Sequence, residues 1–184
     1  MKTLVLGLGN PILTDDGVGV RVAEAIQVAL GRVREAHTWG VGPRCELPAN
    51  PPALVLPAGD DVDVLEVSVG GLTLMEAMIG YERVILIDAF DAEGVQPGDV
   101  QRMTLADLRG ISPTQHSASP HDASLPTAFA LGQQMGLALP AASNVIIYAV
   151  GVANIIDFSD EPTPAVAAVI PAVTAAVLAE LQGE

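Results

Sequence analysis

Residues 1–17 read MKTLVLGLGNPILTDDG, and this stretch decides the predicted fold. The apolar run over residues 3–8 predicts a buried strand, because the strands of a parallel sheet are covered on both faces. A glycine-containing turn follows, and a helix is expected to begin at Gly17. Such a turn usually cradles a phosphate, because a helix N-terminus favours anions. Asp15 and Asp16 would repel an anion, so this turn is predicted to face a metal cation instead.

Strand and helix patterns alternate along the rest of the chain, which is typical of a parallel sheet covered on both faces. Strands are expected at residues 3–8, 62–69, 84–88, 100–105 and 144–150, the fourth of them at a sheet edge. Helices are expected at residues 17–29, 72–79, 122–135 and 164–181, the last of them kinked near Pro171. The sequence therefore predicts a three-layer α/β/α domain with a mostly parallel, twisted sheet of about five strands.

The length of 184 residues predicts one domain, spanning residues 1–184. Hydrophobic residues make up 50% of the chain and aromatic residues only 3%, so the core must consist mainly of Val, Leu, Ile and Ala. Residues 33–61 differ in being rich in Pro and Gly, with one strand-like stretch at residues 53–56. We interpret this segment as an insertion packed on the domain rather than as a flexible linker.

The chain is strongly acidic, with a formal net charge of −14 and no basic run. Phosphate backbones and anionic membrane surfaces would repel it, so nucleic acid and membrane are not expected as partners. A cation or a basic protein segment is favoured. Cys45 is the single cysteine, which excludes an internal disulfide and any multi-cysteine metal cluster and fits a reducing compartment. We expect Cys45 to be an incidental thiol rather than a nucleophile.

Neither end of the chain predicts a signal or a membrane anchor. The apolar run at the N-terminus is too short for a membrane span, and turn residues interrupt it. Residues 165–181 form a longer apolar run, but it is rich in alanine and contains Pro171 and Glu180. A buried helix of a soluble, cytoplasmic protein is therefore expected.

Two aspartates are candidate metal ligands at the carboxyl end of the predicted sheet. Asp16 lies at a strand-to-helix turn, where open α/β folds bind ligands, although capping of the helix is a competing interpretation. Asp88 ends the apolar strand VILI, where a buried carboxylate requires a partner or a cation, unless the strand end is solvated. Asp91 is a weaker candidate nearby.

A histidine is the third candidate ligand. His121 follows Ser119 and Pro120 at the start of a predicted helix, and a neutral imidazole is a good ligand for nickel or zinc. A surface histidine is the competing interpretation, and His116 in the same loop is the competing residue. His37 lies in the insertion and is regarded as incidental. No Gly-x-Ser-x-Gly or His-Glu-x-x-His motif supports serine-protease or zincin chemistry.

Three motifs resemble those of one enzyme family. The stretch GLGNPILTDDGVG at residues 7–19 resembles the opening of the hydrogenase maturation endopeptidases. ILIDA at residues 85–89 resembles the second acidic position of that family, and SPH at residues 119–121 resembles its histidine position. The motifs occur in the order of the family, and the resemblance covers most of the chain outside residues 33–61. These endopeptidases trim the C-terminal tail from the large subunit of nickel–iron hydrogenases.

The resemblance implies a function and a set of site residues. It implies an aspartyl-type hydrolase of peptide bonds in which Asp16, Asp88 and His121 are both catalytic and metal-contacting, with Asp15 as a structural neighbour. The nickel would arrive with the substrate, so no permanently bound cofactor is expected. The implied partner is the large-subunit precursor, processed in the cytoplasm by a monomeric protease. A metal-polarised carbonyl and a metal-activated water are both open as routes to cleavage.

Two alternative functions stay open at this point. A nickel- or precursor-binding chaperone without cleavage activity would keep the same Asp/Asp/His set. Residues 7–11, GLGNP, also resemble the opening of peptidyl-tRNA hydrolase. That family carries a His-Asn pair soon after the turn and a basic surface for tRNA, whereas this chain has Asp15-Asp16-Gly17 and a net charge of −14.

Overall fold

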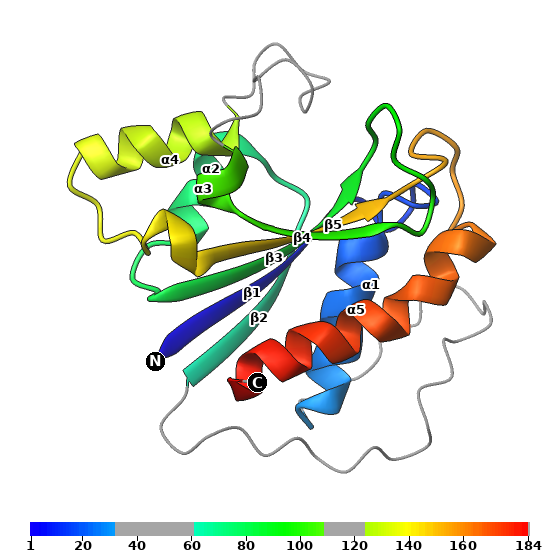
Figure 1. The fold of residues 1–184 in the computed structure, drawn as a ribbon, viewed down its shortest axis with the longest axis horizontal. Coiled ribbons are helices and arrows are strands. Elements are labelled where there is room, and N and C mark those ends of the chain that lie inside the picture. The colour runs from blue at the N-terminus through cyan, green and yellow to red at the C-terminus, as the bar shows by residue number, and fades with distance from the viewer. Residues whose placement is uncertain (32–60, 109–123, 184) are drawn as a thin grey trace.

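The fold is a three-layer sandwich around one five-stranded sheet (Figure 1). The computed structural model describes residues 1–31, 61–108 and 124–183. The sheet order is β2-β1-β3-β5-β4, in which β2, β1, β3 and β5 run parallel and β4 pairs antiparallel with β5 at the edge. The strands are β1 (Lys2–Leu8), β2 (Asp61–Val67), β3 (Arg83–Phe90), β4 (Val100–Thr104) and β5 (Val145–Gly151).

Helices cover both faces of the sheet, so the predicted fold class is confirmed. Helices α1 (Val18–Ala29) and α5 (Pro164–Gln182) pack side by side on one face (Figure 1). The other face carries α2 (Gly71–Ala77), α3 (Leu105–Leu108) and α4 (Leu125–Gln134). A single turn of 3₁₀ helix, η2 (Ala142–Asn144), leads into β5.

The core is divided by the alternation of side chains along each strand. In β1, Leu4 and Leu6 pack against α2, α3 and α4, whereas Val5 between them packs against α1 and α5. Residues of β3 and β5 alternate in the same way, because successive side chains of a strand point to opposite faces. The continuous apolar runs in the sequence therefore reflect strands that are buried on both sides.

In the described part of the chain, the predicted elements agree with the observed ones to within a few residues, with two short additions, α3 and η2. The predicted edge strand at residues 100–105 ends at Thr104, and the short helix α3 begins at Leu105. Four residues are too few to show helical periodicity, so α3 was not predicted. Helix α5 runs unbroken through Pro171, which is exposed.

Several predictions fall on residues outside the described ranges. The predicted insertion, up to residue 60, lies outside them together with Cys45 and His37. The same is true of the predicted site residues His116, Ser119, Pro120 and His121. The predicted helix at residues 122–135 is described only from Ser124, the N-cap of α4. Asp61, at the end of the predicted insertion, is the first residue of β2.

Helix α5 is a core helix although its composition alone would permit a membrane span. It is the one helix in the described part of the chain that is long and apolar enough for this, and its mean hydropathy of 1.9 is weak evidence by itself. One side of the helix packs into the core through five side chains, those of Val166, Ile170, Val173, Val177 and Leu181. One side of α5 is thus buried, as expected, whereas only 33% of its most apolar stretch is buried in all.

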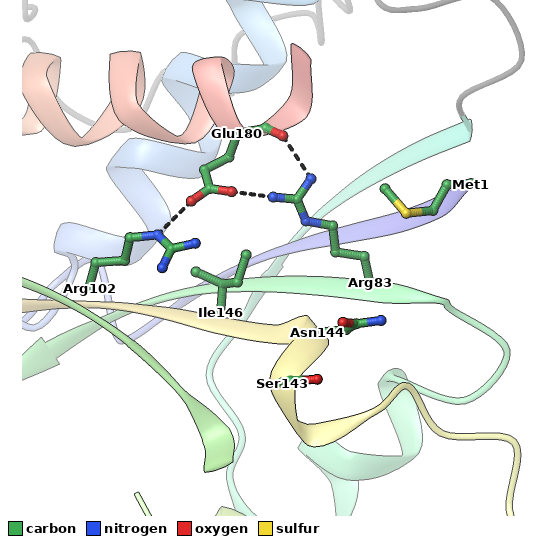
Figure 2. Close-up of a pocket in the computed structure, with 7 residues that line it drawn as sticks. All are labelled: Met1, Arg83, Arg102, Ser143, Asn144, Ile146 and Glu180. Carbon is green, nitrogen blue, oxygen red and sulfur yellow. Dashed lines mark hydrogen bonds and ion pairs between the residues drawn. The ribbon is translucent and has the colours of Figure 1, made fainter. Parts of the chain in front are cut away.

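Ion pairs connect the C-terminal end of α5 to the sheet (Figure 2). Glu180 lies between two arginines and forms ion pairs with Arg83 of β3 and Arg102 of β4. Arg83 also donates to the Glu180 backbone carbonyl at 2.7 Å, which satisfies an acceptor near the helix end. Two strands and one helix are therefore connected through a single carboxylate.

Glycine residues make the closest backbone contact between the N-terminal turn of α1 and the sheet. A Cβ atom on Gly19 would lie 2.3 Å from the carbonyl oxygens of both Leu8 and Ile87. On the strand side of this contact, a Cβ atom on Gly7 would lie 2.2 Å from the Gly19 carbonyl oxygen. No side chain fits between these backbones, so glycine at both positions allows the start of α1 to reach the ends of β1 and β3.

We expect Gly19→Ala to destabilise the protein, because its methyl group would displace backbone rather than a flexible side chain. Overpacking of this kind lowers the free energy of unfolding by roughly 2 kcal/mol. Gly70→Ala is the matched control: its Cβ meets no atom within 4 Å, and the Gly70 φ angle of −128° suits alanine. Urea unfolding of both variants checks the prediction, which equal midpoints would contradict.

Candidate functional site

The turn after β1 places the Asp16 carboxylate at the carboxyl edge of the sheet. Gly9 has a φ angle of +123°, and a Cβ atom there would lie 1.8 Å from the Asp16 carbonyl oxygen. The Asp16 side chain turns back from the helix and accepts a hydrogen bond from the Asn10 backbone N–H at 2.6 Å. Gly17 is the N-cap of α1 and makes no side-chain capping bond. The capping interpretation of Asp16 is therefore wrong, and this carboxylate faces the edge of the sheet.

Asp15, its neighbour, is a structural residue. Its side chain is fully buried, and its carboxylate accepts four hydrogen bonds. The donors are the backbone N–H groups of Ala153, Asn154 and Thr163 and the Thr163 hydroxyl, at 2.6–3.1 Å. A buried carboxylate with this many donors is well satisfied. Asp15 thus connects the turn after β1 to the segment that follows β5, and its predicted structural role is confirmed.

Backbone hydrogen bonds also join the turn after β1 to the segment that follows β5. The Thr14 N–H donates to the Ser159 carbonyl at 3.0 Å, and the Ser159 N–H donates to the Ile12 carbonyl at 3.1 Å. Thr14 has a φ angle of 36°, an unfavourable value for a β-branched residue. Its hydroxyl donates to the Asp157 carbonyl at 2.7 Å, so the contacts with the second segment hold this conformation.

The sequence analysis missed this second segment, residues 153–163, entirely. This segment binds Asp15 mainly through backbone N–H groups, and every residue type except proline has such a group. The residue types of the segment therefore do not reveal it. One signal was present: Thr163 directly precedes Pro164, and Thr followed by Pro is a typical start of a helix. Thr163 is indeed the N-cap of α5, and its N–H and hydroxyl bind Asp15 rather than capping α5 through its side chain.

Asp88 lies near the end of β3 and shares the site with Asp16. Burial and the negative charge of Asp16 raise the pKa of Asp88 from 3.8 to about 7, against a smaller lowering by the Ala89 backbone N–H. Packing also brings Asp88 near Asp16. Gly19, three residues after Asp16, contacts the backbone carbonyl of Ile87, and Ile87 directly precedes Asp88. Two of the three predicted site residues are therefore brought together at the carboxyl edge.

The arrangement suits a cation. Two carboxylates that repel each other in a partly buried site gain free energy when a divalent ion lies between them, since the ion removes the repulsion. His121, the third predicted ligand, is outside the described residues, and so is its competitor His116. Within residues 1–31, 61–108 and 124–183, no three His, Cys, Asp or Glu side chains form a group that could hold a metal. The described part of the site is a pair rather than a complete ligand set.

A cavity at the opposite edge of the sheet is not part of this site (Figure 2). Its volume is about 310 Å³, and its lining includes Arg83, Arg102 and Glu180 near the amino ends of β3 and β5. The arginines there are already paired with Glu180. Open α/β sheets bind ligands at the carboxyl ends of their strands, where Asp16 and Asp88 lie.

The chain is similar to proteins of one known family. A family model described as hydrogenase maturation protease matches residues 55–180, which is more than half of the chain. The chain belongs to the hydrogenase maturation protease family. The matched range includes the positions of Asp88 and His121, whereas the motif around Asp16 lies before it.

Individual relatives in this family are distant. The hydrogenase 2 maturation protease of Escherichia coli K12 is 28% identical over 125 residues, which is 68% of this chain and 59% of that protein's length. The structure of the hydrogenase maturating endopeptidase HybD from Escherichia coli aligns with a TM-score of 0.70 at 23% identity, covering 100% of this chain and 93% of the other. A maturation protease HybD from Thermococcus kodakarensis aligns with a TM-score of 0.57 at 19% identity, covering 98% and 99%. These structures show the same fold.

We expect substitutions of the two adjacent aspartates to affect stability in different ways. Asp15→Asn replaces an acceptor of four hydrogen bonds by a group that also carries donors, and it should lower the free energy of unfolding by roughly 2–3 kcal/mol. Asp16→Asn loses a single backbone contact and relieves repulsion with Asp88, so stability should stay equal or rise. Thermal unfolding of both variants measures the difference; a larger loss for Asp16→Asn would contradict these assignments.

We also expect Asp88 to make stability depend on pH. Because the folded state holds this proton up to about pH 7 and the unfolded chain loses it near pH 3.8, the folded state loses stability as pH rises between these values. Asp88→Asn should remove this contribution, so the variant gains stability relative to wild type on going from about pH 5 to about pH 8. Urea unfolding in the presence of a chelator tests this, and parallel profiles would refute it.

Proposed function

We propose that this protein is an endopeptidase that removes the C-terminal extension from the large-subunit precursor of a nickel–iron hydrogenase. The observation that carries the proposal is the pair of carboxylates at the carboxyl edge of the sheet, Asp16 and Asp88, in a chain of the maturation protease family. A protease that acts only on finished precursors needs a way to recognise the finished state. A carboxylate pair that binds a cation can recognise a finished precursor by the metal ion that it carries.

The recognised feature is the nickel ion already inserted in the precursor. Asp16 and Asp88 contact this ion, and His121 provides the third contact, as the resemblance of its motif implies. The raised pKa of Asp88 favours its protonated form in the free protein, so nickel contact releases this proton. An unloaded precursor offers no cation to replace it, and the two carboxylates then contribute nothing to its binding.

The metal is part of the substrate rather than a resident cofactor. Three protein ligands with no cysteine among them leave an open coordination shell, which the precursor completes. After chelation and gel filtration, we expect metal analysis to find far less than one equivalent of nickel, zinc or iron. A stoichiometric metal that survives this treatment would indicate an ordinary metallohydrolase.

Recognition of nickel also positions the scissile bond next to the carboxylates. Once the ion is seated against Asp16 and Asp88, the adjacent C-terminal segment is held at the carboxyl edge of the sheet. Positioning of this kind converts cleavage into an effectively intramolecular step. We propose that the protein acts as a monomer in the cytoplasm, where the precursor is assembled.

Incubation with nickel-loaded and nickel-free precursor from the same organism tests the proposed function. Mass analysis should show that only the nickel-loaded precursor is shortened at its C-terminus, and that Asp16→Asn and Asp88→Asn abolish this product. Shortening of both precursors would refute nickel recognition. Tight binding of the loaded precursor without any cleavage would identify a chaperone instead of a protease.

The two histidines of the loop before α4 provide a matched pair of variants. We expect His121→Ala to abolish processing and His116→Ala to retain it, because only His121 matches the ligand position of the family motif. The thermal midpoint of each variant is measured alongside, so that loss of processing by unfolding is distinguished from loss of a ligand. Processing by His121→Ala but not by His116→Ala would show that the ligand is His116.

A further inference from the structure

Large apolar side chains are exposed next to the candidate site. Ile12, Ile156 and Phe158 have exposed fractions of 54%, 79% and 81%. The chain has only three phenylalanines, and Phe129 by contrast is fully buried in the core. We refer to Ile12, Ile156 and Phe158 together as the loop patch. Exposed apolar side chains that gather in one place typically mark a binding surface.

Main-chain contacts bring the members of the loop patch together. Ile12 lies in the turn after β1, and the other two lie in the segment after β5. The Ile12 carbonyl accepts a hydrogen bond from Ser159, the residue after Phe158, at 3.1 Å. Leu13, directly after Ile12, forms a parallel bridge with the same Ser159. The loop patch therefore spans two segments that are held as neighbours.

The loop patch is presented on an ordered backbone rather than on a loose loop. The Asn154 side-chain oxygen accepts hydrogen bonds from the N–H groups of Ile156 and Asp157, both at 3.1 Å. The Asn154 N–H itself donates to the buried Asp15 carboxylate at 3.1 Å. The contact from the Thr14 hydroxyl fixes the Asp157 carbonyl. These contacts hold the backbone of residues 154–157 in place although the adjacent apolar side chains remain in solvent.

The loop patch is continuous with the proposed nickel-contacting residues. The Ile12 N–H donates to the Asn10 side-chain oxygen at 3.3 Å, and the Asn10 N–H donates to the Asp16 carboxylate at 2.6 Å. A single turn therefore carries both one end of the loop patch and one member of the carboxylate pair. A molecule that reaches Asp16 is placed next to these apolar side chains.

The charge of the described segments around the loop patch is mainly negative. Three segments meet at the carboxyl edge, residues 9–17, 88–99 and 151–163, and they carry two, four and three carboxyl groups with no Lys, Arg or His. Arg21, in the first turns of α1, donates to the Asp160 backbone carbonyl at this edge. Arg83 and Arg102 are paired with Glu180 near the opposite edge. An apolar surface in acidic surroundings fits a partner segment with apolar and basic side chains.

We propose that the loop patch docks an apolar and basic segment of the large-subunit precursor and thereby orients it for cleavage. This inference rests on the proposed function. The apolar side chains of the segment cover Ile12, Ile156 and Phe158, and its basic side chains lie among the surrounding carboxylates. Docking supplies affinity that does not depend on nickel, while Asp16 and Asp88 detect whether nickel is present.

The test compares the double substitution Ile156→Ser/Phe158→Ser with Met135→Ser. Met135 is also exposed, at 66%, but lies at the C-terminal end of α4 on the other face of the sheet. Binding of the nickel-loaded precursor is measured by interferometry in an Asp16→Asn background, which prevents turnover. We expect the double substitution to weaken binding by about tenfold or more and Met135→Ser to leave it unchanged. Added salt should weaken binding of the precursor to the wild-type protein, because six of the nine carboxyl groups around the loop patch are exposed, those of Asp91, Glu93, Asp99, Asp157, Asp160 and Glu161.

A processing assay in the active background separates this inference from the proposed function. We expect the double substitution to raise KM for the loaded precursor while kcat is retained. If the double substitution leaves binding and KM unchanged while the wild-type protein processes the precursor, the docking proposal is wrong and the protease function stands. Precursor binding that depends on the loop patch without any cleavage would refute the protease function and leave docking supported. Sedimentation supplies a third outcome: self-association of wild type that the double substitution abolishes would show that a second copy covers the loop patch, against the proposal.

Discussion

The close contact between the start of α1 and the ends of β1 and β3 is the constraint on which the site depends. Only glycine at positions 7 and 19 lets these backbones approach, and the contact lies directly before Asp88. Asp16 lies three residues before Gly19, so the packing distance of the helix fixes how near the two carboxylates come. Burial raises the pKa of Asp88 most, and the negative charge of Asp16, which this packing brings near, raises it further. The glycine contact in the core thus determines how strongly two carboxylates at the edge of the sheet interact.

Two adjacent residues of the same type have opposite environments in this turn. Asp15 points inward to four donors, which compensate fully for its burial, while Asp16 points to the edge of the sheet and has Asp88 as its neighbour. The first carboxylate stabilises the turn, and the second adds electrostatic repulsion with Asp88 to it. The structure can hold two like charges together because the hydrogen bonds of Asp15 make the turn rigid.

Most of the fold followed from the sequence, because buried parallel strands and amphipathic helices have distinct apolar patterns. β1 and β3 were recognisable from continuous apolar runs, and Asp88 as a site residue from its place at the end of one of them. A metal-contacting Asp16 could not be separated from helix capping by pattern alone, since both place an aspartate before a helix; in the structure its side chain accepts a hydrogen bond from the Asn10 N–H and not from α1. The network around Asp15 was beyond prediction, because its donors are mostly backbone N–H groups.

The Asp15 network also has a consequence for the order of folding. The carboxylate and its partner Thr163 are 148 residues apart in the chain, so the turn that carries Asp16 closes only after Thr163 has been synthesised. Contacts of such long range slow the folding of a domain. During synthesis, β1 and α1 emerge before the segment after β5, so the turn between them has no partner until that segment follows. The nascent chain therefore lacks the closed turn that carries Asp16 until β5 and the segment after it have emerged.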